Sequence, residues 1–128
     1  MRTVCVLGFI VLLAGCQEKT VRGKPMGDWM KHLKGGWADT RMRAAMAVGD
    51  FGPDARAAVP DLMALLEDRE HLVRWAACGA LAQIGRDAEP ALPTLRRMAK
   101  EEDKKSVRYA AEEAVKEIER QLAEPAGQ

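Results

Sequence analysis

The sequence has few aromatic side chains, three cysteines and almost no net charge. Phenylalanine, tyrosine and tryptophan make up 5% of the 128 residues, and acidic and basic residues nearly cancel to a net charge of +1. Such a chain lacks the strongly basic surface that nucleic-acid binding requires. Three scattered cysteines are too few for a disulfide framework or a tetrahedral zinc site. The composition therefore argues against nucleic-acid binders, zinc proteins and disulfide-stapled domains.

The sequence also lacks a recognisable catalytic motif. His32 and His71 stand alone in separate segments, and no serine or cysteine lies beside a plausible base. No glycine-rich phosphate loop follows a strand pattern. The acidic cluster at 101–103 is typical of a solvated turn or helix face. We therefore expect a protein that is not an enzyme and that has no catalytic residues, cofactor or metal.

The first sixteen residues have the pattern of an export signal. A positive charge at Arg2 precedes an apolar run over 4–13, which is too short to span a bilayer as a mature helix. Leu13-Ala14-Gly15-Cys16 then resembles the lipobox of bacterial lipoproteins. This resemblance implies a signal peptide over 1–15, cleavage before Cys16 and a diacylglycerol on the Cys16 thiol. An ordinary secretory signal with a chance cysteine is the alternative.

A lipid on Cys16 would hold the protein in the cell envelope, at an extracytoplasmic or periplasmic membrane face. Two or more acyl chains anchor a protein stably because each buried methylene contributes about 0.8 kcal/mol. Residues 16–24 are polar and are interpreted as a lipidated, flexible tether. The choice between inner and outer membrane stays open.

A repeated pattern organises the rest of the chain. Residues 73–95 resemble residues 40–62 at an offset of 33, and residues 107–118 resemble residues 73–84 at an offset of 34. The matched positions include Arg41 with Arg74 and Arg108, Ala44 with Ala77 and Ala111, and Gly52 with Gly85. Self-similarity at one period over three copies is typical of a solenoid.

Within each copy, apolar residues recur at the spacing of one helix face. A first helix is predicted from Pro25 to the glycines at 35–36. Further helices are predicted from Asp39 or Thr40 to Phe51, over Val59–Leu66, over Leu72–Ile84, over Ala91–Ala99, and from a Ser106 cap to Leu122. Together they predict one all-α domain over 25–122, followed by a tail over 123–128.

The chain resembles the HEAT-repeat family, in its short bacterial, PBS-lyase-type form, at Val73-Arg74-Trp75-Ala76-Ala77, at Val107-Arg108-Tyr109-Ala110-Ala111 and at Ile84-Gly85. The resemblance implies a short right-handed α-solenoid of about three helical pairs that binds protein. It also implies that Asp68 and three arginines, Arg41, Arg74 and Arg108, link stacked repeats. Gly35 stands where the first repeat would carry the matching aspartate, so that first link stays open.

One side of the Val-Arg helices is predicted to face away from the core. At about 100° per residue, Trp75 points opposite to the core positions of its own helix. Met42, Met46 and Tyr109 fall in the same or a neighbouring column. We call Met42, Met46, Trp75 and Tyr109 the strip, and we predict that it binds a protein, because solenoids bind through extended faces and interfaces are enriched in such residues. Packing of Trp75 against its own neighbours is the alternative.

These observations predict a membrane-anchored lipoprotein whose HEAT-repeat solenoid binds an unknown partner protein outside the cytoplasm. A structural envelope protein that assembles with its own copies is one alternative, and an accessory related to bilin chromophore lyases is another. The partner and the oligomeric state stay open. So does the reactivity of Cys78, whose small neighbours favour packing on a helix over reaction.

Overall fold

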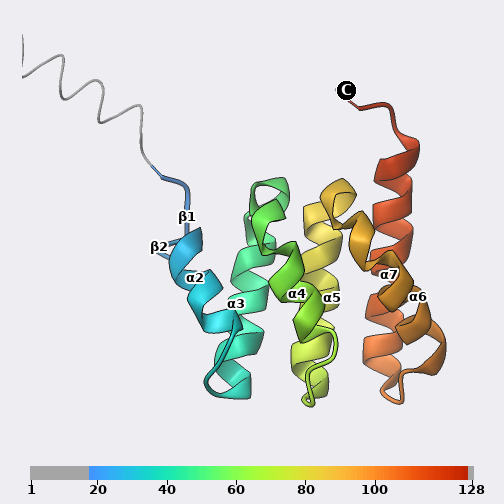
Figure 1. Ribbon diagram of the computed structural model, residues 1–128, viewed down its shortest axis with the longest axis horizontal. Helices are drawn as coiled ribbons and strands as arrows, with labels where there is room; N and C mark the ends of the chain where they lie inside the picture. The colour runs from blue at the N-terminus through green and yellow to red at the C-terminus, as the bar shows by residue number, and fades with distance from the viewer. Residues whose placement is uncertain (1–17, 127–128) are drawn as a thin grey trace, which may run out of the picture.

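The computed structural model describes residues 18–126, which form a short N-terminal hairpin followed by helices (Figure 1). The strands are β1 (Thr20–Val21) and β2 (Lys24–Pro25), and the helices are α2 (Met26–Leu33), α3 (Ala38–Asp50), α4 (Val59–Leu65), α5 (His71–Ile84), α6 (Leu92–Glu101) and α7 (Lys105–Ala123). Two 3-10 segments, η1 (Gly52–Ala58) and η2 (Gly85–Ala91), precede α4 and α6. The expected signal peptide and Cys16 lie outside the described residues.

The helices form three successive pairs, α2 with α3, α4 with α5, and α6 with α7 (Figure 1). The helices α3, α5 and α7 lie side by side in one layer, α5 packing against both of its neighbours, and α2, α4 and α6 form the second layer. The prediction of a short all-α solenoid is therefore confirmed.

Small residues let the helices of the α3–α5–α7 layer approach closely. Ala44, Ala77 and Ala111 are fully buried at equivalent positions. A Cβ added at Gly49 of α3 would stand 2.9 Å from the Cα of Ala80 on α5, so the two backbones are nearly in contact there. Larger aliphatic side chains, including Leu81 and Leu62, fill the space between the two layers.

The 3-10 segments η1 and η2 are a feature that the helical periodicity did not predict. Each begins at a glycine with positive φ, 63° at Gly52 and 78° at Gly85, a conformation that favours glycine. Each then buries two alanines, Ala55 and Ala58 in η1 and Ala88 and Ala91 in η2. The segments reverse the chain between the layers, and the helices that follow begin at Val59 and Leu92.

The predicted flexible tether is wrong for its last residues. Thr20 pairs with Pro25 and Val21 with Lys24 in an antiparallel hairpin whose turn contains Gly23 at a φ of 75°. The indole Nε1 of Trp29 donates a 3.0 Å hydrogen bond to the Val21 carbonyl. These contacts fix the segment against the domain because they satisfy backbone and indole groups at once.

Lys19 ties the start of the hairpin to the first helical pair. Its ammonium group donates hydrogen bonds to the Phe51 carbonyl at 3.1 Å and to the Asp54 carboxylate at 2.9 Å. Any free tether would therefore end before Lys19.

Two further details of the sequence prediction differ from the structure. Helix α7 begins at Lys105, so Ser106 lies in the first turn and forms no side-chain cap. Helix α3 begins at Ala38 with Trp37 at its N-cap, so it starts before Asp39 and Thr40. Within residues 18–126, no helix combines the length and the apolar character that crossing a membrane requires.

Candidate functional site

Arg41 of α3 binds the loop that follows α4 in the next repeat. Its Nε and Nη2 donate to the two carboxylate oxygens of Asp68 at 2.8 and 3.1 Å. Its Nη1 donates to the Gly36 carbonyl at 2.6 Å. Only 11% of the Arg41 side chain and 9% of the Asp68 side chain are exposed. This bidentate geometry fixes the orientation of both groups as well as their separation.

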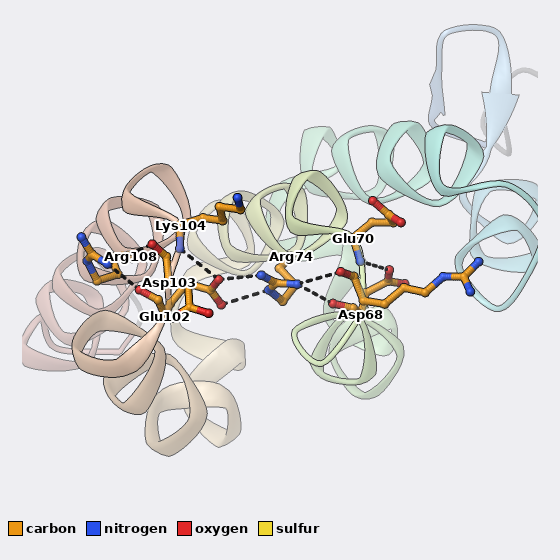
Figure 2. Close-up of polar contacts among 8 residues, drawn as sticks. Asp68, Glu70, Arg74, Glu102, Asp103, Lys104 and Arg108 are labelled. Carbon is orange, nitrogen blue, oxygen red and sulfur yellow. Dashed lines mark hydrogen bonds and ion pairs between the residues drawn. The ribbon is translucent and has the colours of Figure 1, made fainter.

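Arg74 of α5 repeats this arrangement one repeat further on (Figure 2). Its Nε and Nη2 donate to the Glu102 carboxylate at 3.0 and 2.5 Å, and its Nη1 donates to the Asp68 carbonyl at 2.8 Å. Asp68 thus accepts from Arg41 through its side chain and from Arg74 through its backbone. We call this chain of contacts, from Arg41 through Asp68, Arg74 and Glu102 to Arg108, the arginine ladder.

Arg108 of α7 is the last member of the ladder within residues 18–126. Its Nη1 donates to the carbonyls of Glu102 at 2.6 Å and Asp103 at 3.3 Å, as the Nη1 of Arg74 does one repeat earlier (Figure 2). The ladder therefore contains all four residues that the resemblance implied, and the structure adds Glu102. Gly35 supplies no carboxylate, and Arg41 instead uses the neighbouring Gly36 carbonyl.

The ladder holds its carboxylates in the charged form. At Asp68, partial burial works to raise the pKa, but hydrogen bonds from Arg41 and from the Glu70 amide outweigh it, and the net pKa is lowered. At Glu102, the hydrogen bond from Arg74 is the largest influence and lowers the pKa. Both oxygens of each carboxylate already accept hydrogen bonds from an arginine of α3 or α5. These charged pairs therefore act as structural links between repeats.

Glu102 was missed by the sequence analysis, although a signal for it exists. It stands 34 residues after Asp68, the same offset that relates Arg74 to Arg108. A glutamate replaces the aspartate at this position, and its longer side chain still reaches both donor atoms of Arg74. A comparison by residue identity misses the equivalence of Asp68 and Glu102, whereas a comparison by charge at the repeat offset finds it.

Three strip residues line one hollow of about 330 Å³ on the α3–α5–α7 layer. Met46 comes from α3, Trp75 from α5 and Tyr109 from α7. Gly79 of α5 forms part of the lining, and a Cβ added there would meet no atom within 4 Å. Met42 is partly buried on α3 and does not line the hollow. The missing side chain at Gly79 leaves a depression between residues of the neighbouring helices.

The large apolar side chains that stay exposed in the described part of the chain all belong to this layer or to its edge. They are Trp37 (85% exposed), Leu72 (51%), Trp75 (40%) and Tyr109 (63%). Trp37 immediately precedes α3, and Leu72 lies in the first turn of α5. Exposed aromatic groups of this size are enriched at protein interfaces. Their role in binding stays a prediction.

Two other side chains that the sequence singled out, Cys78 and His32, pack against their neighbours. Cys78 is fully buried on α5, and burial is the largest influence that raises the pKa of its thiol to about 12. The His32 ring makes an edge contact with Trp29. Among residues 18–126, no group of three or more histidine, cysteine, aspartate or glutamate side chains is placed to hold a metal ion.

Comparison with known proteins supports the family resemblance. No curated protein matches the chain significantly. Residues 28–116 match the family described as HEAT repeats, a span that begins within α2 and ends within α7. Because this match covers well over half of the sequence, and because the structure stacks helical pairs over the same span, the chain belongs to the HEAT-repeat family.

Proposed function

We propose that the protein is a lipid-anchored, non-catalytic module that binds a partner protein through the hollow lined by Met46, Trp75 and Tyr109. HEAT repeats are helical scaffolds that mediate protein interaction, which is the coarse function that the family supports. The observation that carries the finer proposal is the meeting of three strip residues, one from each repeat, around a single depression. Packing within one repeat does not require that arrangement.

The hollow suits apolar side chains of a partner polypeptide. Trp75 and Tyr109 supply aromatic surface, Met46 supplies an adaptable thioether, and Gly79 leaves room between them. Its volume of about 330 Å³ lies at the small end of the range of ligand pockets, about 300–1,000 Å³. We therefore expect it to accept one or two anchoring side chains, with Trp37 and Leu72 contacting the partner at the edge of the same layer.

The proposed location rests on the sequence around Cys16. The lipobox-like Leu13-Ala14-Gly15-Cys16 stands directly before the chain segment that leads into the hairpin. A diacylglycerol on Cys16 would hold the solenoid close to the membrane surface, because only residues 17 and 18 separate it from Lys19, which binds the first helical pair. The partner would then be an envelope protein at the same face.

Site-specific cross-linking tests the binding surface. A photoreactive p-benzoylphenylalanine placed at Gly79 should cross-link a discrete protein in living cells, because a side chain there enters open space. The same group at Ala64, an exposed residue of α4 in the opposite layer, is the matched control. Cross-linking at Gly79 that disappears when Tyr109 is changed to alanine supports the proposal. Equal cross-linked products at Ala64, or no cross-linked product at Gly79, would contradict the proposal.

Acylation tests the anchor separately. Cys16→Ser should abolish both incorporation of a fatty-acid probe and cleavage before residue 16, since the thiol is the acceptor. Cys5→Ser, which alters the apolar run without touching the lipobox, should leave both unchanged. A Cys16→Ser protein that takes up the probe at the wild-type level would show that the lipoprotein interpretation is wrong.

A further inference from the structure

The last arginine of the ladder, Arg108, differs from Arg41 and Arg74 in its partners. In Arg41 and in Arg74, Nη1 binds a backbone carbonyl of the preceding loop, whereas Nε and Nη2 together bind a carboxylate. Arg108 has the same Nη1 anchor, to the Glu102 and Asp103 carbonyls. Among residues 18–126, its Nε and Nη2 have no acceptor and no carboxylate pairs with it.

The Arg108 guanidinium is held in place before any partner arrives. Two carbonyls fix one of its nitrogens, and the residue is only partly exposed at the start of α7. In Figure 2, Arg108 lies on the far side of Glu102 and Asp103 from Arg74. A fixed planar fork loses less conformational freedom on binding a carboxylate than a free side chain does. The free edge is therefore a preorganised receptor for two coplanar oxygens.

Another repeat stacked in the same way is a poor candidate for the acceptor. Glu112 of α7 is exposed at the position where α5 has the buried Cys78. Glu119 stands at the position of Gly85, which follows α5, and its carboxylate pairs with Arg96 at 2.6 Å on an exposed face. Close stacking on α7 would bury the Glu112 carboxylate and the Arg96–Glu119 ion pair, and removing these charged groups from water is costly. The α7 face has the polar character of a terminal capping repeat.

We propose that Arg108 binds an aspartate or glutamate side chain of a partner protein, through Nε and Nη2, beside the first turn of α7. A carboxylate is the expected anion because the two equivalent arginines of this chain hold Asp68 and Glu102 by those atoms. Arg108 is the neighbour of Tyr109, so one partner can contact this site and the strip together. The Arg108 site does not depend on the strip, and its test is independent of it.

The test is a nuclear magnetic resonance titration of the full chain in non-ionic detergent, with a one-carboxylate mimic of a glutamate side chain, N-acetylglutamate N-methylamide, at constant ionic strength. The Nε–H signal of Arg108 should shift and saturate, with an apparent affinity at least fivefold higher than at Arg56. Arg56 is the matched control because it is exposed and makes no side-chain hydrogen bond within the described residues. Equal, unsaturated shifts at both arginines would overturn the proposal.

Variants separate bidentate binding from simple charge. The backbone amides of 102–109 report binding in every variant. Arg108→Lys keeps the charge but loses the fork, and the affinity should fall at least fivefold, whereas Trp75→Ala should leave it unchanged. An Arg108→Lys protein that binds as wild type would overturn the proposal. Failure at Arg108 would leave the strip proposal standing, and loss of cross-linking at Gly79 would leave this one standing.

Two further arms exclude competing occupants. Glu112 lies one turn after Arg108, and Glu112→Gln should change the affinity for the carboxylate probe by less than twofold. If that variant instead shifts the Arg108 signal without probe, the chain itself fills the edge and the proposal is wrong. Inorganic phosphate should bind at least fivefold more weakly than the carboxylate. Tighter binding of phosphate would point to a phosphate group in place of an acidic side chain and would overturn the proposal.

Discussion

Arg41 and Asp68 lie 27 residues apart in the chain, yet the guanidinium of one holds both oxygens of the other at 2.8 and 3.1 Å. Both side chains are about nine-tenths buried. Asp68 is in turn fixed by the amide of Glu70, which donates to its carboxylate at 3.0 Å. The pair therefore joins α3 to the loop before α5 and sets how the first two helical pairs stack.

Removing the charge of Asp68 is expected to destabilise the domain. Asp68→Asn leaves the Arg41 guanidinium partly buried without its counter-ion, and it should lower the free energy of unfolding by about 2–4 kcal/mol. Asp39→Asn is the matched control, since Asp39 pairs with Arg43 on an exposed face of the same helix, and it should change stability by less than ~0.5 kcal/mol. Urea unfolding at pH 7 measures both. Equal effects would show that Asp68 does not link the repeats.

Acid should weaken the ladder in a defined direction. The pKa values of Asp68 and Glu102 are lowered from ordinary values of 3.8 and 4.5. As the pH falls through these ordinary values, the unfolded chain takes up protons before the folded chain does. The stability that the two carboxylates contribute is therefore complete at neutral pH and decreases as the pH drops below about 4.5. Glu102→Gln removes one such group and should flatten the fall in urea midpoint between about pH 5 and pH 3. A wild-type slope in that variant would contradict the role of Glu102.

The sequence predicted the helices α3, α5 and α7 well because their alanines and aliphatic residues repeat at a fixed period. Ala44, Ala77 and Ala111 are equivalent in the sequence and equally buried in the structure. The hairpin was not predicted, since strands of two residues carry too little pattern, and what fixes them is the distant bond from Trp29 to Val21. The segments η1 and η2 were missed because buried alanines in a 3-10 turn have no helical period.

The candidate site was predictable to the extent that it follows the period. Trp75 and Tyr109 are equivalent positions, and their common face follows from helix geometry. The hollow itself depends on Gly79, which stands between Met46 and Glu113 in its column, and on the spacing of three helices. The spacing of these helices depends on how their side chains pack, and the residue pattern of a single sequence does not predict it.

The core position of Leu81 gives a direct test of the fold. Leu81→Ala removes a fully buried side chain of α5, and it should cost about 2–5 kcal/mol of unfolding free energy. Leu72→Ala on the same helix is the matched control, since Leu72 is exposed, and its effect should stay within about 0.5 kcal/mol. Thermal melts followed by circular dichroism at a helical wavelength compare the two. Indistinguishable melts for Leu81→Ala and wild type would contradict the packing described above.

Tyr109 distinguishes binding from folding better than Trp75, because more of its side chain is exposed. Trp75→Ala should also weaken binding, but the buried part of the indole makes some loss of stability expected as well. Tyr109→Ala removes one wall of the hollow while leaving the core untouched. Leu72→Ala provides the comparison, because Leu72 is an exposed apolar residue outside the lining of the hollow.

The decisive measurement is calorimetric titration of the wild-type protein, Tyr109→Ala and Leu72→Ala with the purified protein that cross-links at Gly79. We predict that Tyr109→Ala lowers the affinity by more than about 1 kcal/mol, as buried interface aromatics commonly do, while its melting temperature stays close to that of the wild type. Leu72→Ala should lose less affinity than Tyr109→Ala. Unchanged affinity in Tyr109→Ala, or a loss of affinity that only follows unfolding, would contradict the proposal that the hollow binds the partner.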